Sequence, residues 1–121
     1  MRSTFHSSRK FNKEIANWDV SRVNNMQNFL SNAIAFDQDL EKWNTESVTT
    51  MHGMFQGARL FNKPLTNWNT AKVTTMSYMF GGYLSSPNPF NQDLSGFDTS
   101  QVTTMSHMFG EARAFNQDVR Q

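Results

Sequence analysis

The chain has 121 residues, no cysteine, and a formal net charge of +1 from 11 basic and 10 acidic residues. This length suits one small domain, and the near-neutral charge argues against nucleic acid or an anionic membrane as partner. Without cysteine there is no disulfide framework and no cysteine-containing zinc site, and the redox compartment stays open. No apolar run reaches the roughly 18 to 20 residues that span a bilayer, so direct membrane insertion is not expected. The first residues also lack the apolar stretch of a signal peptide.

A Phe column recurs along the chain at spacings of 25, 25, 29 and 25 residues. Its members are Phe11, Phe36, Phe61, Phe90 and Phe115. Between them runs the pattern Phe-Asn-x-x-Leu-x-x-Trp-Asp-x-x-x-Val-x-x-Met-x-x-Met-Phe-x-x-Ala. Such a period is typical of an array in which each unit buries its apolar face against its neighbours. We therefore expect one array over residues 1–121. It consists of a partial repeat (1–10), complete repeats at 11–35, 36–60, 61–89 and 90–114, and the start of a further repeat at 115–121.

Each repeat is predicted to hold one short strand followed by one short helix. Segments such as "FDQDLEKWN" are too short for a helix and predict an extended strand around the leucine. In the second half, Val48, Met51, Met54, Phe55 and Ala58 form an apolar stripe at steps of three and four, which is typical of a helix. The predicted fold is thus an α/β repeat solenoid, right-handed by the crossover rule. It should curve with its strands on the concave side, because strands stack more closely than helices.

Residues 90–119, "FNQDLSGFDTSQVTTMSHMFGEARAFNQDV", resemble the bacterial surface-protein repeat family related to BspA-like leucine-rich repeats. Its units run approximately FNQDLS-x-WDTS-x-VTNM-x-x-MF-x-GA, and the resemblance extends over nearly the whole chain. It implies a leucine-rich-repeat-like solenoid that is displayed on cell surfaces and used for adhesion or protein binding. The chain departs from the pattern in a four-residue insertion within "GGYLSSPNPF", in Phe29-Leu30 for Met-Phe, and in the missing signal.

Six residues are candidates for binding a protein partner. Four belong to an acidic column that Pro64 interrupts, and two lie in the irregular loop at 81–89. They are Glu14, Asp39, Asp93 and Asp118, together with Tyr83 and Leu84. The acidic column would face a cation or a basic partner, or would simply be a solvated face. The scattered His6, His52 and His107 favour surface positions, so neither a metal site nor a cofactor is expected.

The remaining columns predict structure better than chemistry. The column Asn12, Asp37, Asn62, Asn91 and Asn116 suggests a side-chain hydrogen-bond ladder. The Trp and Met columns predict a buried core, with a sugar-stacking platform as the alternative for the tryptophans. The Thr49-Thr50 pair and its equivalents suit ice binding poorly, because they are predicted on a helical side. No nucleophile–base pair, phosphate loop or zinc spacing is present, so an enzyme is not expected.

Two functions remain open at this point. The first is a non-catalytic protein-binding or adhesion module that uses the concave face and the irregular loop. The second is an architectural subunit fixed inside a larger assembly. Both ends of the sequence lie within a repeat, so Phe5, Phe11, Phe115 and Val119 are expected to expose apolar sides. We therefore expect continuation, docking to a partner, or end-to-end contact between copies.

Overall fold

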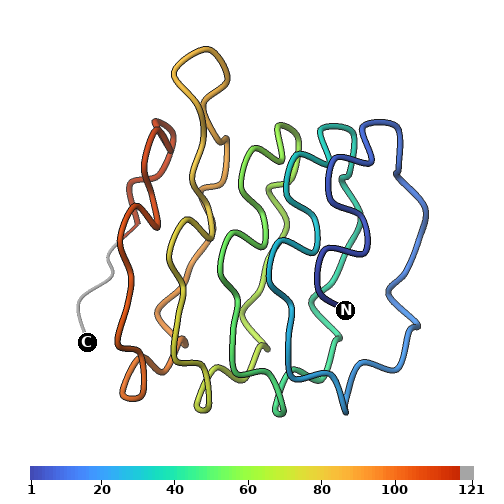
Figure 1. The fold of residues 1–121 in the computed structure, drawn as a ribbon, viewed down its shortest axis with the longest axis vertical. Helices are drawn as coiled ribbons and strands as arrows, with labels where there is room; N and C mark the ends of the chain where they lie inside the picture. Colours follow the sequence, from blue (N-terminus) through green and yellow to red (C-terminus); the bar gives the residue numbers. More distant parts are fainter. Residues whose placement is uncertain (118–121) are drawn as a thin grey trace.

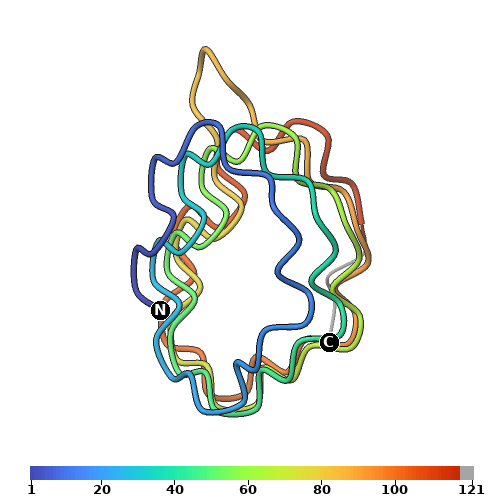
Figure 2. The same ribbon diagram turned by 90° about the vertical axis from the view of Figure 1, so that its right-hand side faces the viewer.

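The computed structural model describes residues 1–117 and shows a chain wound into coils that lie side by side (Figure 1). Seen along the stack, the coils after residue 35 follow nearly the same outline around a common interior, whereas the blue segment of coil 1 lies inside it, and one loop projects beyond it (Figure 2). We number the coils 1 to 4 as residues 11–35, 36–60, 61–89 and 90–114. Residues 1–10 form a partial coil before coil 1.

The prediction of an α/β solenoid is wrong. Residues 1–117 contain no helix and no extended strand, only isolated bridges between single residues. Three are parallel and one is antiparallel: Asn25–Thr50, Thr50–Thr75, Thr75–Thr104 and Tyr83–Ser86. The leucine-rich-repeat-like curvature and the right-handed crossover both assumed a layer of strands and a layer of helices. Neither layer is present among the described residues, so both predictions lose their basis.

The segment predicted as a helix is a run of tight turns. The N–H of Met54 donates to the carbonyl of Met51 at 3.2 Å, three residues back, whereas an α-helix would use the fourth. Gly53 and Gly57 have φ angles of +60° and +68°, a left-handed conformation that ends any right-handed helix. With left-handed residues four apart, the chain turns so that an apolar side chain points into the interior every three or four residues. The apolar spacing therefore resembles that of a helix although the backbone is not helical.

Backbone N–H groups that a helix would use internally point to the next coil instead. From coil 2, the alternate residues Met51, Gly53, Phe55 and Gly57 donate to the carbonyls of Thr75, Ser77, Met79 and Gly81 at 2.8 to 3.0 Å. The same register links the partial coil to coil 1, coil 1 to coil 2, and coil 3 to coil 4. Because buried backbone groups must be paired, each coil depends on its neighbours for its own hydrogen bonds.

On the other side of the coils, asparagine side chains form the ladder that the sequence predicts. The Oδ1 of Asn62 accepts from the N–H of Asn91 at 2.8 Å, and Gln92 Nε2 donates to the carbonyl and Oδ1 of Asn62 at 3.0 and 3.2 Å. Two further junctions repeat this arrangement. Between coils 2 and 3, an ion pair joins Asp37 to Lys63 at 3.9 Å.

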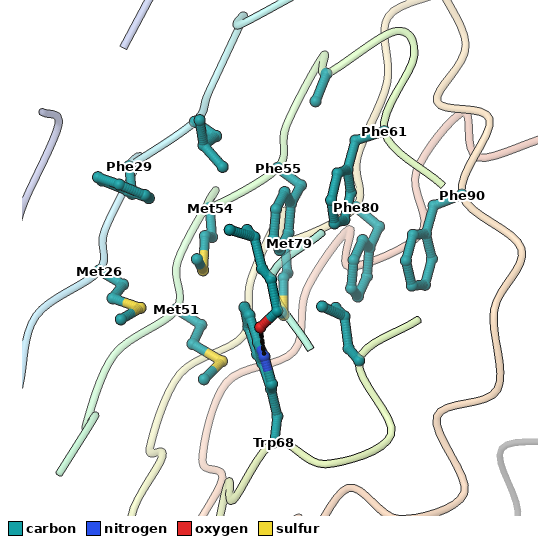
Figure 3. Packing of buried hydrophobic residues seen from close by; sticks show 14 of the residues in the cluster. Met26, Phe29, Met51, Met54, Phe55, Phe61, Trp68, Met79, Phe80 and Phe90 are labelled. Atoms are coloured by element: carbon teal, nitrogen blue, oxygen red, sulfur yellow. Dashed lines mark hydrogen bonds between the residues drawn. The ribbon is translucent and has the colours of Figure 1, made fainter. Parts of the chain in front are cut away.

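Stacked aromatic rings fill the interior along the axis. The rings of Phe55 and Phe80 lie 5.7 Å apart and within 2° of parallel, and those of Phe61 and Phe90 lie 6.2 Å apart and within 8°. Phe80 also stacks on Phe90 at 3.9 Å, which joins the two columns (Figure 3). Stacked aromatic pairs of this kind stabilise a fold by more than the burial of their apolar area alone.

The predicted burial of the Trp and Met columns is confirmed in the middle of the stack. Trp43 and Trp68 are 2% and 3% exposed, and their rings stack at 6.5 Å, which leaves no sugar platform there. The outer members differ, because Trp18 and Met105 are each 44% exposed. Both belong to coils that lack a complete neighbour on one side among the described residues. The same position explains the half-buried rings of Phe5, Phe11 and Phe115, whereas Val119 lies outside the described residues.

Candidate binding groove beside the inserted loop

The four-residue insertion forms a small hairpin that projects from the stack (Figures 1 and 2). Tyr83 and Ser86 each donate their N–H to the other's carbonyl at 2.9 Å. Between them, the side chain of Leu84 is 77% exposed. The sequence predicts a surface loop here, and the structure gives this loop a defined hairpin geometry.

Asn88 fixes the end of the hairpin to the stack. Its side chain is buried, and Nδ2 donates to the carbonyls of Phe55 at 3.0 Å and Gly81 at 3.4 Å. Its backbone N–H donates to the carbonyl of Glu111 at 3.1 Å. A Cβ at Gly82 would lie 2.5 Å from the Asn88 nitrogen, so this close approach requires glycine. Through its side chain and its backbone N–H, Asn88 therefore ties the hairpin to coils 2 and 4.

Tyr83 leans back over the earlier coils. Its hydroxyl accepts a hydrogen bond from Asn32 Nδ2 at 3.3 Å. Its ring covers Gly57 so closely that an added Cβ there would lie 2.7 Å from Tyr83 Cε2. The tyrosine is still 41% exposed. One sequence-predicted binding residue is thus held in place against coils 1 and 2 while it keeps an accessible surface.

Tyr78 and His107 occupy the same left-handed position as Gly53, with φ angles of 60° and 57°. Coil 1 places Asn28 there, a residue type that tolerates this conformation, as glycine does. Bulky side chains rarely adopt it. The tyrosine and histidine rings stack at 4.9 Å within 5° of parallel, and His52 meets the tyrosine edge-on at 5.7 Å. Coils 3 and 4 therefore carry an aromatic pair where coils 1 and 2 carry small residues.

A groove of about 270 Å³ lies where the hairpin meets the tight turns around Tyr78 and His107 in coils 3 and 4. Three aromatic side chains, three glycines and two polar side chains line it. They are Tyr78, Tyr83, His107, Gly81, Gly82, Gly110, Gln56 and Glu111. Of these, only Tyr83 is a binding residue predicted from the sequence. The signal for the others was a tyrosine and a histidine in a column held elsewhere by serine, asparagine and glycine.

The acidic column is not part of this groove. Its segments lie on the opposite side of the coils from the turn segments (Figure 2). Asp39 and Asp93 each use Oδ1 to accept the N–H two residues on, at 2.8 Å. The backbone hydrogen bond from Ser95 lowers the pKa of the Asp93 carboxyl. The pKa values of Asp19 and Asp98 are lowered by the side-chain and then the backbone hydrogen bonds of their serine partners. These carboxylates stabilise local turns, Glu14 is exposed, and Asp118 lies outside the described residues.

The threonine column Thr49, Thr74 and Thr103 serves the backbone. Its hydroxyls donate to the carbonyls of Asn24, Thr49 and Thr74 at 3.0 to 3.2 Å. The prediction that these residues lie on the side of a helix is wrong, because their segments are not helical. Each hydroxyl thus links two neighbouring coils and donates to the same carbonyl as the backbone N–H of its own residue.

Within residues 1–117, no three His, Cys, Asp or Glu side chains come close enough together to hold a metal ion. The same part of the chain forms no helix of the length and hydropathy that a membrane crossing requires.

The fold defines a repeat protein in which stacked coils of tight turns are joined by backbone and asparagine ladders. The family model described as "Mycoplasma protein of unknown function, DUF285" matches residues 1–87 and, in a second alignment, residues 48–121. The chain therefore belongs to this family. The two overlapping matches are offset along the repeats, as expected for a repeating unit. Neither the curated proteins nor the solved structures gave a match.

Proposed function

We propose that the chain is a non-catalytic protein-binding module that holds a partner segment in the groove beside the Tyr83 hairpin. One observation carries this proposal: the left-handed Tyr78 and His107 stack where they line the groove. A left-handed residue other than glycine costs about 1 to 2 kcal/mol. Coils 1 and 2 avoid part of this cost with Asn28 and Gly53. Local strain of this kind gathers at functional sites.

The hairpin supports the same proposal. It interrupts an otherwise regular register, and a loop on a rigid scaffold is a common place for binding residues. Tyrosine is enriched at protein interfaces because it combines apolar area with a hydrogen-bonding hydroxyl. Tyr83 offers such a surface, and its position is fixed by Asn32 and Gly57. A partner would therefore meet a preorganised surface, which lowers the entropic cost of binding.

The biological setting that we propose is adhesion at a bacterial surface. The resemblance of residues 90–119 to bacterial surface-protein repeats supports it, and membership of a mycoplasma family is compatible with it. This setting does not depend on a leucine-rich-repeat fold, which the described residues, without helices and extended strands, do not form.

A displayed library of random peptides, selected on the immobilised chain, tests the proposal. Selected peptides should bind the wild-type chain and lose affinity for two groove variants, a deletion of residues 83–86 and Tyr78→Asn. Asparagine suits the left-handed backbone, as it does at position 28, so this variant removes the ring without straining the fold. Glu14→Ala, on the opposite side of the coil, is the matched control and should bind normally.

The proposal fails if the library yields no peptide whose binding depends on the groove. It also fails if both groove variants, once shown to fold, bind the selected peptides as tightly as the wild type does. Thermal melting of each variant separates lost binding from lost structure.

A further inference from the structure

One carboxylate lines the groove, and it is paired with a neighbouring arginine through only one of its two oxygens. Glu111 is its one carboxylate, and no lysine or arginine lines it. The Oε2 atom of Glu111 accepts from Nε and Nη2 of Arg113 at 3.2 and 3.0 Å. Its Oε1 atom makes no hydrogen bond to any residue among 1–117, and the Glu111 side chain is 35% exposed. The carboxylate thus has a free acceptor oxygen at the edge of the groove, and the contact with Arg113 shows that a guanidinium reaches it.

The aromatic side chains beside this carboxylate favour a cation of a particular shape. Tyr78 and His107 stack face to face, so each ring covers one face of the other, and the His107 ring is exposed. Tyr83 adds a third ring from the hairpin. A guanidinium is planar and stacks on aromatic faces, and it also forms directed hydrogen bonds to a carboxylate. An ammonium group acts as a point charge and would use the flat stack less well.

The size of the groove limits its occupant. About 270 Å³ lies below the range of roughly 300 to 1,000 Å³ that is usual for small-molecule sites. A helix would not enter a space of this volume. One extended side chain would.

From the free carboxylate oxygen, the aromatic lining and the size of the groove, we propose that it takes an arginine side chain of the partner protein, stacked on the Tyr78–His107 pair and hydrogen-bonded to Glu111. This inference rests on the proposed function, since it names the residue that anchors the partner. Arg113 stays on Oε2, and the incoming guanidinium uses Oε1 of the same carboxylate. Gln56, the other polar residue of the groove, offers an amide to the backbone of the partner segment.

Amide NMR on the full chain tests the inference with N-acetyl-arginine methylamide as the probe. We expect saturable shifts at Gly81, Gly82, Gly110 and Glu111. The citrulline analogue, which has nearly the same shape but no charge, should bind at least about tenfold more weakly, because the charge-assisted bond is lost. Glu111→Gln should abolish the preference of arginine over citrulline, and Glu14→Ala should preserve it.

Equal binding of arginine and citrulline, or shifts from methyl glycosides but not from arginine, would overturn the inference. The peptide selection distinguishes this failure from failure of the proposed function. Groove-dependent peptides with arginine at a fixed position support both statements. Groove-dependent peptides without arginine leave the protein-binding module standing and refute the arginine anchor. The absence of any groove-dependent peptide refutes both.

Discussion

The indole nitrogen of Trp68 donates a hydrogen bond to the backbone carbonyl of Leu40, 28 residues earlier in the chain, at 2.9 Å (Figure 3). Trp43 makes the same bond to Ile15 at 3.0 Å, so successive coils are linked through the core as well as along their edges. Each indole fills the interior and also pairs a carbonyl that would otherwise lie unsatisfied in an apolar environment.

Replacing Trp43 with alanine should lower the free energy of unfolding by about 3 to 5 kcal/mol, as for other buried aromatic residues. Trp68→Phe keeps most of the ring and should cost about 1 to 3 kcal/mol, because the Leu40 carbonyl loses its partner. Urea denaturation followed by circular dichroism measures both changes. Trp18→Phe is the control, since this side chain is 44% exposed, and it should change stability by less than about 0.5 kcal/mol. A Trp43→Ala variant as stable as the wild type would contradict the interior position.

At the left-handed turn positions, replacing glycine and replacing tyrosine should have opposite effects on stability. Gly53→Ala should destabilise the chain by about 1 to 2 kcal/mol, because φ is +60° and the added Cβ would clash with Asn28 Oδ1. Tyr78→Asn, in the equivalent position of coil 3, should leave stability unchanged or raise it while it weakens peptide binding. Thermal melting and the peptide titration are measured on the same samples. A loss of stability in Tyr78→Asn as large as that in Gly53→Ala would mean that the ring is held for packing.

Acid should weaken the fold through the carboxylates that stabilise turns. The hydrogen bonds from Ser21, Ser95 and Ser100 lower the pKa of Asp19, Asp93 and Asp98 in the folded chain. A lowered folded-state pKa means that this stabilisation is fully present above the unfolded-state value, about 3.9. It is lost as pH falls through the lower folded-state pKa values.

Changing all three aspartates to asparagine tests this prediction. Asparagine keeps an acceptor oxygen, and the native Asn44 and Asn69 already make the equivalent bonds at 3.0 Å. The triple variant should have a flatter dependence of melting temperature on pH between about 5 and 2 than the wild type. Parallel pH profiles in the two proteins would show that other groups control acid unfolding.

Deleting residues 83–86 restores the 25-residue register between Phe61 and Phe90. The backbone bonds from coil 2 to coil 3 end at Gly57 and Gly81, ahead of the deletion, so the stack should survive. We expect a cooperative thermal transition within a few degrees of the wild type. Leu84→Ser is the matched control and should leave stability unchanged, because this side chain is 77% exposed. Loss of cooperative melting in the deletion would show that the hairpin is part of the core structure.

The burial pattern could be predicted from the sequence, but the backbone could not. Met51, Met54 and Phe55 point inward as their columns predict, because an apolar residue repeated at one position in every unit must be covered by its neighbours. The spacing of these residues fits both a helix and a series of turns. Gly53 and Gly57, with asparagines in coil 1 at the same two positions, were the evidence for turns. A single glycine inside a helical pattern is tolerated, but two glycines four apart, each matched by an asparagine in coil 1, argue against a helix.

The candidate site was predictable only in part. Tyr83 and Leu84 stood out because the insertion breaks the period. Tyr78, His107 and Glu111 belong to ordinary repeat positions, and only the turn geometry brings them to the groove. The acidic column looked like a surface for a partner, yet Asp39 and Asp93 are engaged by the backbone two residues on. From sequence alone, a carboxylate that stabilises a turn and one that awaits a cation look the same.

The alternating ladder of backbone bonds between coils also bears on how such a chain evolves. Duplication or loss of one whole unit leaves every donor opposite an acceptor, so the number of coils is free to change in a single genetic event. A shift of one residue inside the run of tight turns would place N–H groups of one coil opposite N–H groups of the next, along the whole junction between the two coils. Additions of other lengths persist only where the chain can bulge outward, as it does at residues 83–86. New surface features in this architecture therefore arise where the chain bulges out of a coil, while the interior keeps the spacing of the repeat.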